Sequence, residues 1–163
     1  MDYFDIVYIV FTIIVTLYSI LMILFLIYGF VGIFWKRRFK ETNTKSKLAI
    51  VVSARNEDNV IKNLIDSIKN SNYPNELVKI FVVAHNCIDS TALVAKESGA
   101  IVYDYNNELE SRKGYALKYL FEKIDADYGI SSFDGYIILD SDNTVSSNYL
   151  SKMNDAFIAN KRK

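Results

Sequence analysis

LAIVVSARNE, at residues 48–57, is an apolar run that changes abruptly into a polar one. Its first five residues are continuously apolar and rich in β-branched side chains, as expected for a strand that is buried on both faces of a parallel sheet. The polar residues that follow are expected to stand at the carboxyl end of that strand. The remaining sequence can be interpreted from this unit, because further strand-like and helix-like patterns follow it.

The sequence after residue 57 alternates between helical and extended patterns. Apolar residues at helical spacing predict helices near 60–68, 90–98, 116–124 and 146–157, the last of them capped by Ser146 or Ser147. Runs of β-forming residues predict further strands at 78–83, 100–103 and 136–139. This alternation is typical of an α/β fold with a mostly parallel sheet and flanking helices.

Polar residues follow three of the four predicted strands. They are SARNE at 53–57, HNCID at 85–89 and DSDN at 140–143. The carboxyl ends of parallel strands lie at one edge of a sheet, and α/β sheets bind their ligands there. Three polar strand ends from distant parts of the chain therefore predict a binding site at this edge.

Residues 6–35 form a stretch of thirty residues without a charge. About twenty apolar residues suffice to cross a hydrocarbon core, so this stretch predicts a transmembrane helix. A cleaved signal peptide is disfavoured because the chain begins with acidic rather than basic residues, and a buried core helix would rarely be apolar on every face. Aromatic residues suited to the two membrane interfaces flank the stretch: Tyr3, Phe4 and Tyr8 at one end, Tyr28, Phe34 and Trp35 at the other.

The charges beside this stretch predict its orientation. Residues 36–47 contain six Lys or Arg and one Glu, whereas the N-terminal flank carries only Asp2 and Asp5. The positive-inside rule then places the N-terminus outside and the rest on the cytoplasmic face of a cell membrane, with the basic run near anionic lipid headgroups. We therefore expect a single-pass segment at 1–36, a basic juxtamembrane linker at 37–47 and a soluble domain at 48–163.

The composition of the soluble part excludes several classes of protein. Residues 48–163 carry thirteen Lys or Arg and sixteen Asp or Glu, a net charge of −3 that argues against nucleic-acid binding. A single cysteine, Cys87, excludes an internal disulfide and is typical of a reducing compartment. One cysteine and one histidine, His85, cannot supply the usual four ligands of a structural zinc site.

The DSDN segment places Asp140 and Asp142 two positions apart at a strand end. Hard cations such as Mg²⁺ are often held by one or two carboxylates together with substrate phosphates. The alternative is that this segment is only a turn with helix-capping residues, and the pair alone does not decide between the two. The chain lacks both the Gly-x-Gly-x-x-Gly fingerprint and the P-loop pattern, so a dinucleotide fold and a P-loop enzyme are not indicated.

Five segments taken together resemble the family 2 glycosyltransferases. They are LAIVVSARNE (48–57), the Tyr73-Pro74 step, VVAHNCIDST (82–91), KGYAL (113–117) and IILDSDN (137–143), in the order and similar spacing of the family. The likeness is greatest to membrane-bound bacterial members that build extracellular or cell-wall polysaccharide. It implies a GT-A fold, a nucleotide-sugar donor, Mn²⁺ or Mg²⁺ as cofactor, and a glycan or lipid-linked acceptor.

The resemblance also implies roles for single residues. Ser53, Arg55 and Glu57 would line the base and ribose pocket, and Lys113 would contact the diphosphate. Two alternatives stay open, because Lys113 could be a solvated lysine at a helix start and Glu57 an acid favoured by the dipole of the first helical turn.

The carboxylates and the histidine complete the implied site. Asp140 would approach the ribose or the metal, and Asp142 would bind the metal. His85 stands where the family usually has an aspartate that reads the base, so the identity of the nucleotide stays open. Asp89 matches a later aspartate of the family, and we expect it to cap the next helix.

The family places its acceptor site and catalytic base well beyond the metal motif, whereas this sequence continues for only 21 residues after Asp142. We therefore expect half an active site, with the catalytic base outside the chain and no sugar transfer by the chain alone. One alternative is a non-catalytic or split-gene nucleotide-binding membrane module that works with a second chain. Another is a fragment of a haloacid-dehalogenase-like phosphatase, since residues 137–145 also fit the first motif of that family, with Asp140 as nucleophile and Asp142 as general acid.

Overall fold

The computed structural model of the chain describes residues 2–34 and 39–160. The chain divides into two compact units, residues 1–38 and residues 39–163. Each unit is described by itself. Trp35 and the basic residues 36–38, which take part in the predicted membrane segment and its flank, lie outside the described residues.

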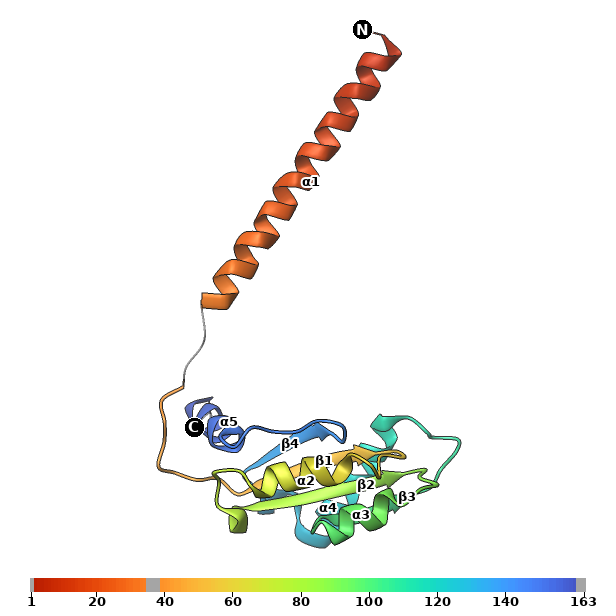
Figure 1. Cartoon of the computed structure of the whole chain (residues 1–163), viewed down its shortest axis with the longest axis vertical. Helices are drawn as coiled ribbons and strands as arrows, with labels where there is room; N and C mark the ends of the chain where they lie inside the picture. The colour runs from red at the N-terminus through yellow and green to blue at the C-terminus, as the bar shows by residue number, and fades with distance from the viewer. Residues whose placement is uncertain (1, 35–38, 161–163) are drawn as a thin grey trace. The chain divides into compact units, whose positions relative to one another are not determined.

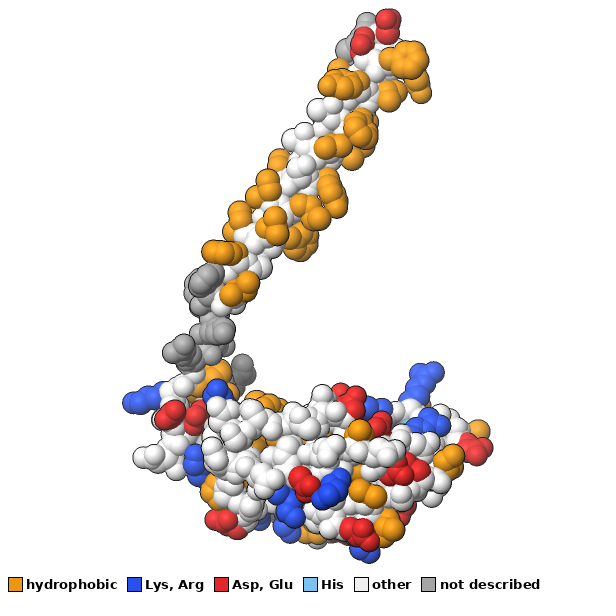
Figure 2. Space-filling view, in the orientation of Figure 1, with side chains coloured by type: hydrophobic (Ala, Val, Ile, Leu, Met, Phe, Trp, Pro, Cys, Tyr) orange, Lys and Arg blue, Asp and Glu red, His pale blue; other side chains and the backbone are white. Residues whose placement is uncertain are grey.

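The first unit contains one helix, α1 (Tyr3–Phe34), with apolar side chains along its whole length (Figure 2). Within the described residues, Tyr3–Ile33 is the one helix long and apolar enough to cross a membrane. The hydroxyls of Thr12, Thr16 and Ser19 donate to the helix carbonyls four residues earlier, at 2.7–2.8 Å. These bonds remove the cost of placing a hydroxyl in an apolar environment, so the three residues are compatible with a membrane helix.

The second unit is built on a four-stranded parallel sheet with the strand order β3-β2-β1-β4 (Figure 1). The strands are β1 (Leu48–Ala54), β2 (Val78–His85), β3 (Ile101–Tyr105) and β4 (Gly135–Asp140). Six of the seven residues of β1 are buried, as expected for a central strand that is covered on both faces. The predicted α/β fold with a parallel sheet is confirmed.

Helices cover both faces of this sheet (Figure 1). Side chains of α2 (Ile61–Lys69), α3 (Thr91–Glu97) and α5 (Tyr149–Asn160) join Ile50 and Val52 of β1 in one core cluster. On the opposite face, α4 (Lys113–Tyr128) contributes Ala116, Leu120 and Ile124 to a second cluster with Val51 and Phe81. Alternate residues of β1 therefore enter different cores, which follows from the two-residue period of a strand.

Two local features differ from the sequence interpretation. The strands β1, β2 and β3 extend to Ala54, His85 and Tyr105, each two residues beyond its predicted end, because parallel pairing continues to these positions. The expected cap of the last helix at Ser146 or Ser147 is also displaced. The helix α5 begins at Tyr149, so Asn148 precedes it, and the Ser146 hydroxyl donates to the Asn148 side chain at 3.0 Å.

The segment before β1 is held against α5, although residues 37–47 were expected to act as a linker. The backbone N–H of Thr42 donates to Asp155 and that of Ser46 to Asn154, each at 3.0 Å. The Asn154 amide nitrogen donates to the carbonyl of Thr44 at 2.8 Å, and the Tyr73 hydroxyl donates to the carbonyl of Ser46 at 2.7 Å. Residues 42–46 therefore belong structurally to the sheet-containing unit.

Candidate functional site

The register of the sheet fixes the centre of the candidate site. Ser53 of β1 pairs with Asp140 of β4, and both stand at the carboxyl ends of their strands. The chain runs from β1 through β2 to β3 on one side, and β4 then adds to the other side of β1. The junction between β1 and β4 is therefore the topological switch point, the place at which open α/β sheets bind ligands.

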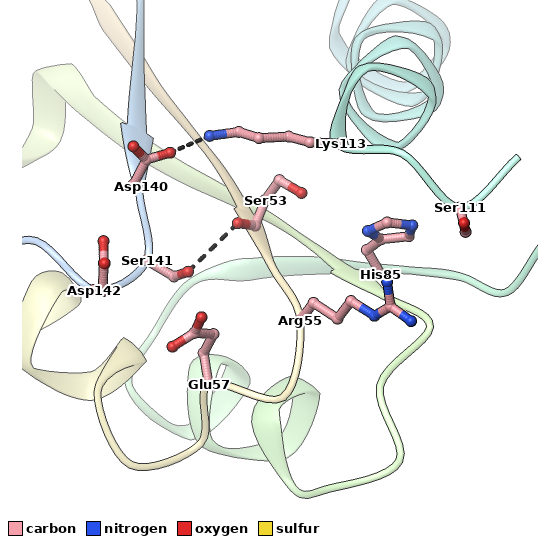
Figure 3. Close-up of a pocket in the computed structure, with 9 residues that line it drawn as sticks. All are labelled: Ser53, Arg55, Glu57, His85, Ser111, Lys113, Asp140, Ser141 and Asp142. Carbon is pink, nitrogen blue, oxygen red and sulfur yellow. Dashed lines mark hydrogen bonds and ion pairs between the residues drawn. The ribbon is translucent and has the colours of Figure 1, made fainter.

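A cleft of about 390 Å³ opens at this junction (Figure 3). All seven residues selected from the sequence line it, and they come from the ends of β1, β2 and β4 and from the start of α4. The nine lining residues are Ser53, Arg55, Glu57, His85, Ser111, Lys113, Asp140, Ser141 and Asp142. Ser111 and Ser141 were not selected from the sequence. The Ser141 hydroxyl donates to the carbonyl of Ser53 at 3.4 Å, which ties the turn after β4 to β1.

Two asparagines with positive φ shape the loops that carry the cleft residues. Asn56 has a φ of 54° and Asn86 a φ of 47°, in the left-handed region that asparagine tolerates better than most residues. The side chain of Asn86 donates to the carbonyl of Asn107 at 3.0 Å and accepts the Asn107 N–H at 2.7 Å. This exchange holds the loop after β2 to the loop after β3. The Asn56 side chain accepts the N–H of Ile88 at 2.9 Å, which joins the loops after β1 and β2.

Glu57 lies before α2 rather than in its first turn. The helix starts at Ile61, whose N–H donates to the Glu57 carbonyl at 2.9 Å, so the alternative role as a first-turn acid does not apply. The Glu57 N–H donates to the Thr91 hydroxyl at 2.7 Å. Asp89 accepts the N–H and the hydroxyl of Thr91, the first residue of α3, whereas Ser90 stands at the cap position of that helix and makes no side-chain cap bond. Hydrogen bonds from the Thr91 side chain and backbone hold the pKa of Asp89 below its ordinary value, with burial opposing them.

Lys113 and Asp140 form an ion pair at the cleft (Figure 3). Lys113 is the first residue of α4, and its side chain extends from the helix start to the carboxylate at the end of β4. The Lys113 side chain is 48% exposed and lines the cleft, and its contact with a diphosphate stays a prediction. The pair places one positive and one negative group at the same end of the cleft.

His85 is buried in the cleft, with 3% of its surface exposed. Its Nε2 atom has no hydrogen-bond partner among the residues that the structure describes. Burial lowers the pKa of the imidazole, and the positive charge of Arg55 lowers it further. The ring is therefore neutral at pH 7, with one donor nitrogen and one acceptor nitrogen. The ring of Tyr105 lies 5.7 Å away, centroid to centroid.

The two aspartates of the predicted metal site have exposed side chains on one wall of the cleft. Across residues 2–34 and 39–160, no group of three or more His, Cys, Asp or Glu is placed to hold a metal ion. Two carboxylates are a partial donor set for Mg²⁺ or Mn²⁺, which take about six oxygen ligands. The residues present fit a metal ion that arrives with phosphate oxygens, and they do not form a closed metal site of their own.

A parallel α/β sheet with a charged cleft at its switch point is a ligand-binding type of α/β domain. The chain belongs to the family described as glycosyltransferase like family 2, and the match covers residues 46–163. The resemblance inferred from the sequence is thereby confirmed. Protein RfbJ of Shigella flexneri is 29% identical over 113 residues, which cover 69% of this chain and 78% of that relative.

Solved structures of glycosyltransferases share the fold. The mannosyltransferase PcManGT from Pyrobaculum calidifontis, in complex with GDP-Man and Mn²⁺, has a TM-score of 0.62 at 15% identity, covering 82% of this chain and 39% of that one. Glucosyl-3-phosphoglycerate synthase of M. tuberculosis has a TM-score of 0.57 at 21% identity, covering 76% and 48%. TarS 1-349 of S. aureus has a TM-score of 0.56 at 18% identity, covering 69% and 32%. The chain therefore spans less than half the length of these structures.

Proposed function

We propose that the sheet-containing unit binds the nucleoside diphosphate part of a nucleotide-sugar donor in the cleft between β1 and β4. One observation carries this proposal: seven residues from three strand ends and one helix start line a single cleft that contains both carboxylates and cations. Family membership supports the same function. The likeness in fold to PcManGT, which was solved with GDP-Man and Mn²⁺, supports a donor that binds with a divalent metal.

The charged end of the cleft is the part suited to the diphosphate. The ammonium of Lys113 offers three donors to phosphate oxygens, and Asp140 and Asp142 would hold Mn²⁺ or Mg²⁺ from the protein side. The metal would neutralise the charge that develops on a diphosphate leaving group. Ser53, Arg55 and Glu57 would then face the ribose and base, as the family resemblance implies, with His85 close to Arg55.

We further propose that α1 anchors this unit to a membrane, with the N-terminus outside and the cleft on the cytoplasmic side. The support is the apolar length of α1 and the excess of Lys and Arg at residues 36–47. A donor site on the cytoplasmic face would give access to soluble nucleotide sugars and to acceptors at the membrane surface. This position suits synthesis of polysaccharide or envelope glycan.

A non-catalytic or split-gene role remains the second candidate. The chain covers 39% of PcManGT and 32% of TarS 1-349, and a catalytic base is not assigned among its described residues. An inverting transfer requires a base within hydrogen-bond reach of the acceptor hydroxyl. A second chain would then supply the base and the acceptor site, while this chain binds the donor.

Calorimetry on the full chain in detergent micelles tests the proposed donor site. UDP and GDP are titrated with and without Mn²⁺ into the wild-type chain and into Asp142→Ala. We expect metal-dependent binding of one nucleotide that weakens at least tenfold in the variant, because a ligand of the metal is lost. The matched control is Asp66→Ala, which removes an exposed carboxylate of α2 that pairs with Lys62 outside the cleft. Nucleotide binding that depends neither on Mn²⁺ nor on Asp142 would refute the proposal.

A further inference from the structure

The ion pair between Lys113 and Asp140 joins two groups that the ligand should use separately. The side chains are 48% and 60% exposed, so the pair is a weak one that can exchange partners at little cost to the fold. Asp142 makes no ion pair with the described residues (Figure 3). In the ligand-free cleft, one of the two carboxylates is therefore already neutralised by a cation of the chain.

We propose that this ion pair makes the cleft select the preformed complex of a divalent metal with a nucleoside diphosphate over either component alone. The inference rests on the proposed function, in which Lys113 contacts the diphosphate and Asp140 contributes to metal binding. It adds that the two contacts are coupled through the partner exchange of one ion pair.

Binding of either component alone leaves a charge without its partner. A metal ion that takes Asp140 displaces the Lys113 ammonium and leaves it beside a dication. A nucleotide that takes Lys113 leaves the Asp140 carboxylate facing the phosphates. The complex avoids both costs, because its phosphate replaces Asp140 as the partner of Lys113 and its metal replaces Lys113 as the partner of Asp140. Coupling of this kind is reciprocal, so each component must raise the affinity for the other by the same factor.

The first test measures Mn²⁺ binding without nucleotide, by electron paramagnetic resonance on the full chain in detergent micelles. Lys113→Met should bind Mn²⁺ alone roughly two- to fivefold more tightly than wild type, the size expected for release of one exposed ion pair. Lys118→Met is the matched control, because Lys118 lies on the same helix, outside the cleft, and pairs with Glu122 at 3.9 Å. This control should leave Mn²⁺ binding unchanged. Lys113→Gln serves as a second cleft variant in case the methionine disturbs the fold.

The second test measures UDP and GDP binding by calorimetry in saturating Mn²⁺ and in its absence. Lys113→Met should weaken nucleotide binding in Mn²⁺ by about tenfold, so the same substitution acts in opposite directions on metal alone and on the complex. Asp140→Asn should strengthen metal-free nucleotide binding and weaken binding in Mn²⁺. The factor by which Mn²⁺ raises nucleotide affinity should fall in both variants and stay at the wild-type value in Lys118→Met.

The outcomes separate this inference from the proposed function. If wild type binds neither nucleotide in Mn²⁺, the proposed function fails. If wild type binds the complex, but Lys113→Met and Lys113→Gln leave Mn²⁺ binding unchanged, weaker or unmeasurable, the coupling fails and the donor site stands. If Lys113 only attracts phosphate, Lys113→Met should weaken nucleotide binding but leave unchanged the factor by which Mn²⁺ raises nucleotide affinity. That result would also overturn the inference.

Discussion

The buried amide of Asn154 gives the sharpest stability prediction for this fold. Asn154 has no exposed surface, and it connects α5 to the segment before β1 and to Tyr73. Its Oδ1 atom accepts the Ser46 N–H at 3.0 Å and shares the Tyr73 O–H, at 3.1 Å, with the Ser46 carbonyl. Its Nδ2 atom donates to the Thr44 carbonyl at 2.8 Å. Asn154→Ala removes all three bonds and leaves a buried N–H and a carbonyl without their partner.

The size of the effect follows from these contacts. A hydrogen bond in a folded protein contributes about 1 kcal/mol net, and a buried group left unpaired costs about 1–3 kcal/mol. The Tyr73 hydroxyl keeps its bond to the Ser46 carbonyl, so its loss is partial. We therefore expect Asn154→Ala to lower the free energy of unfolding by about 3 kcal/mol. Asn160→Ala is the control, because Asn160 is an exposed asparagine at the end of the same helix whose side chain donates within the helix, to the Ala156 carbonyl at 2.6 Å.

Urea unfolding in detergent micelles measures both variants, with the near-ultraviolet circular dichroism of the tyrosines as the signal. The midpoint should fall for Asn154→Ala and stay within the error of about 0.5 kcal/mol for Asn160→Ala. Equal values for the two variants would show that water replaces the lost bonds and that the segment before β1 is not held by α5. The reasoning on the 42–46 segment would then be refuted.

Two further predictions concern the histidine and the glycines. His85 is the only histidine in the sequence, so its imidazole can be followed by NMR. We expect its pKa to lie below the ordinary 6.5 because of burial and the positive charge of Arg55, and we expect this pKa to rise in Arg55→Met. Because the pKa of His85 is lower in the folded chain than in the unfolded chain, the unfolded chain binds more protons below about pH 6.5. The wild-type chain should therefore lose stability below this pH relative to His85→Gln. A measured pKa at or above 6.5 in the folded chain would contradict this prediction. Gly99→Ala should destabilise by about 1 kcal/mol, because Gly99 has a φ of 89°, a conformation that residues with a Cβ rarely adopt. Gly114→Ala, in α4 with open space around it, should stabilise by roughly 0.5–1 kcal/mol, and thermal unfolding that gives both the same sign would be inconsistent with this assignment.

Much of the fold could be predicted because the central strands are buried on both faces. Such strands are continuous apolar runs, and β1 and the apolar stretch 80–84 of β2 are clear in the sequence. The strand ends were harder, because Ser53 and His85 are polar and yet lie within the ladder. Backbone pairing with neighbouring strands fixes these ends, and it leaves no mark on the side-chain pattern of a single strand.

The site was predicted from strand ends, and its missing members show what that approach cannot detect. Ser141 lies between Asp140 and Asp142, which the sequence pattern itself indicates as site residues. The contribution of Ser141 depends on a turn that directs its hydroxyl to the Ser53 carbonyl. Ser111 belongs to the loop before α4, a segment without apolar periodicity. Asn154 has an ordinary polar sequence context and gains its importance only because α5 packs over the entry to β1. These are tertiary contacts between residues distant in the chain.

The division of the cleft between strand and loop residues bears on how the site can respond to a ligand. Ser53, His85 and Asp140 are strand residues, and parallel pairing with neighbouring strands fixes their backbone. Arg55 and Glu57 lie in the loop after β1, and Lys113 begins α4. Partner exchange by Asp140 then requires only rotation of an exposed side chain on a fixed backbone, which keeps the reorganisation small. A cleft with its proposed metal-binding carboxylate at the end of the edge strand β4 and its proposed phosphate-binding cation on a long, flexible side chain can couple the two ligands without moving the sheet.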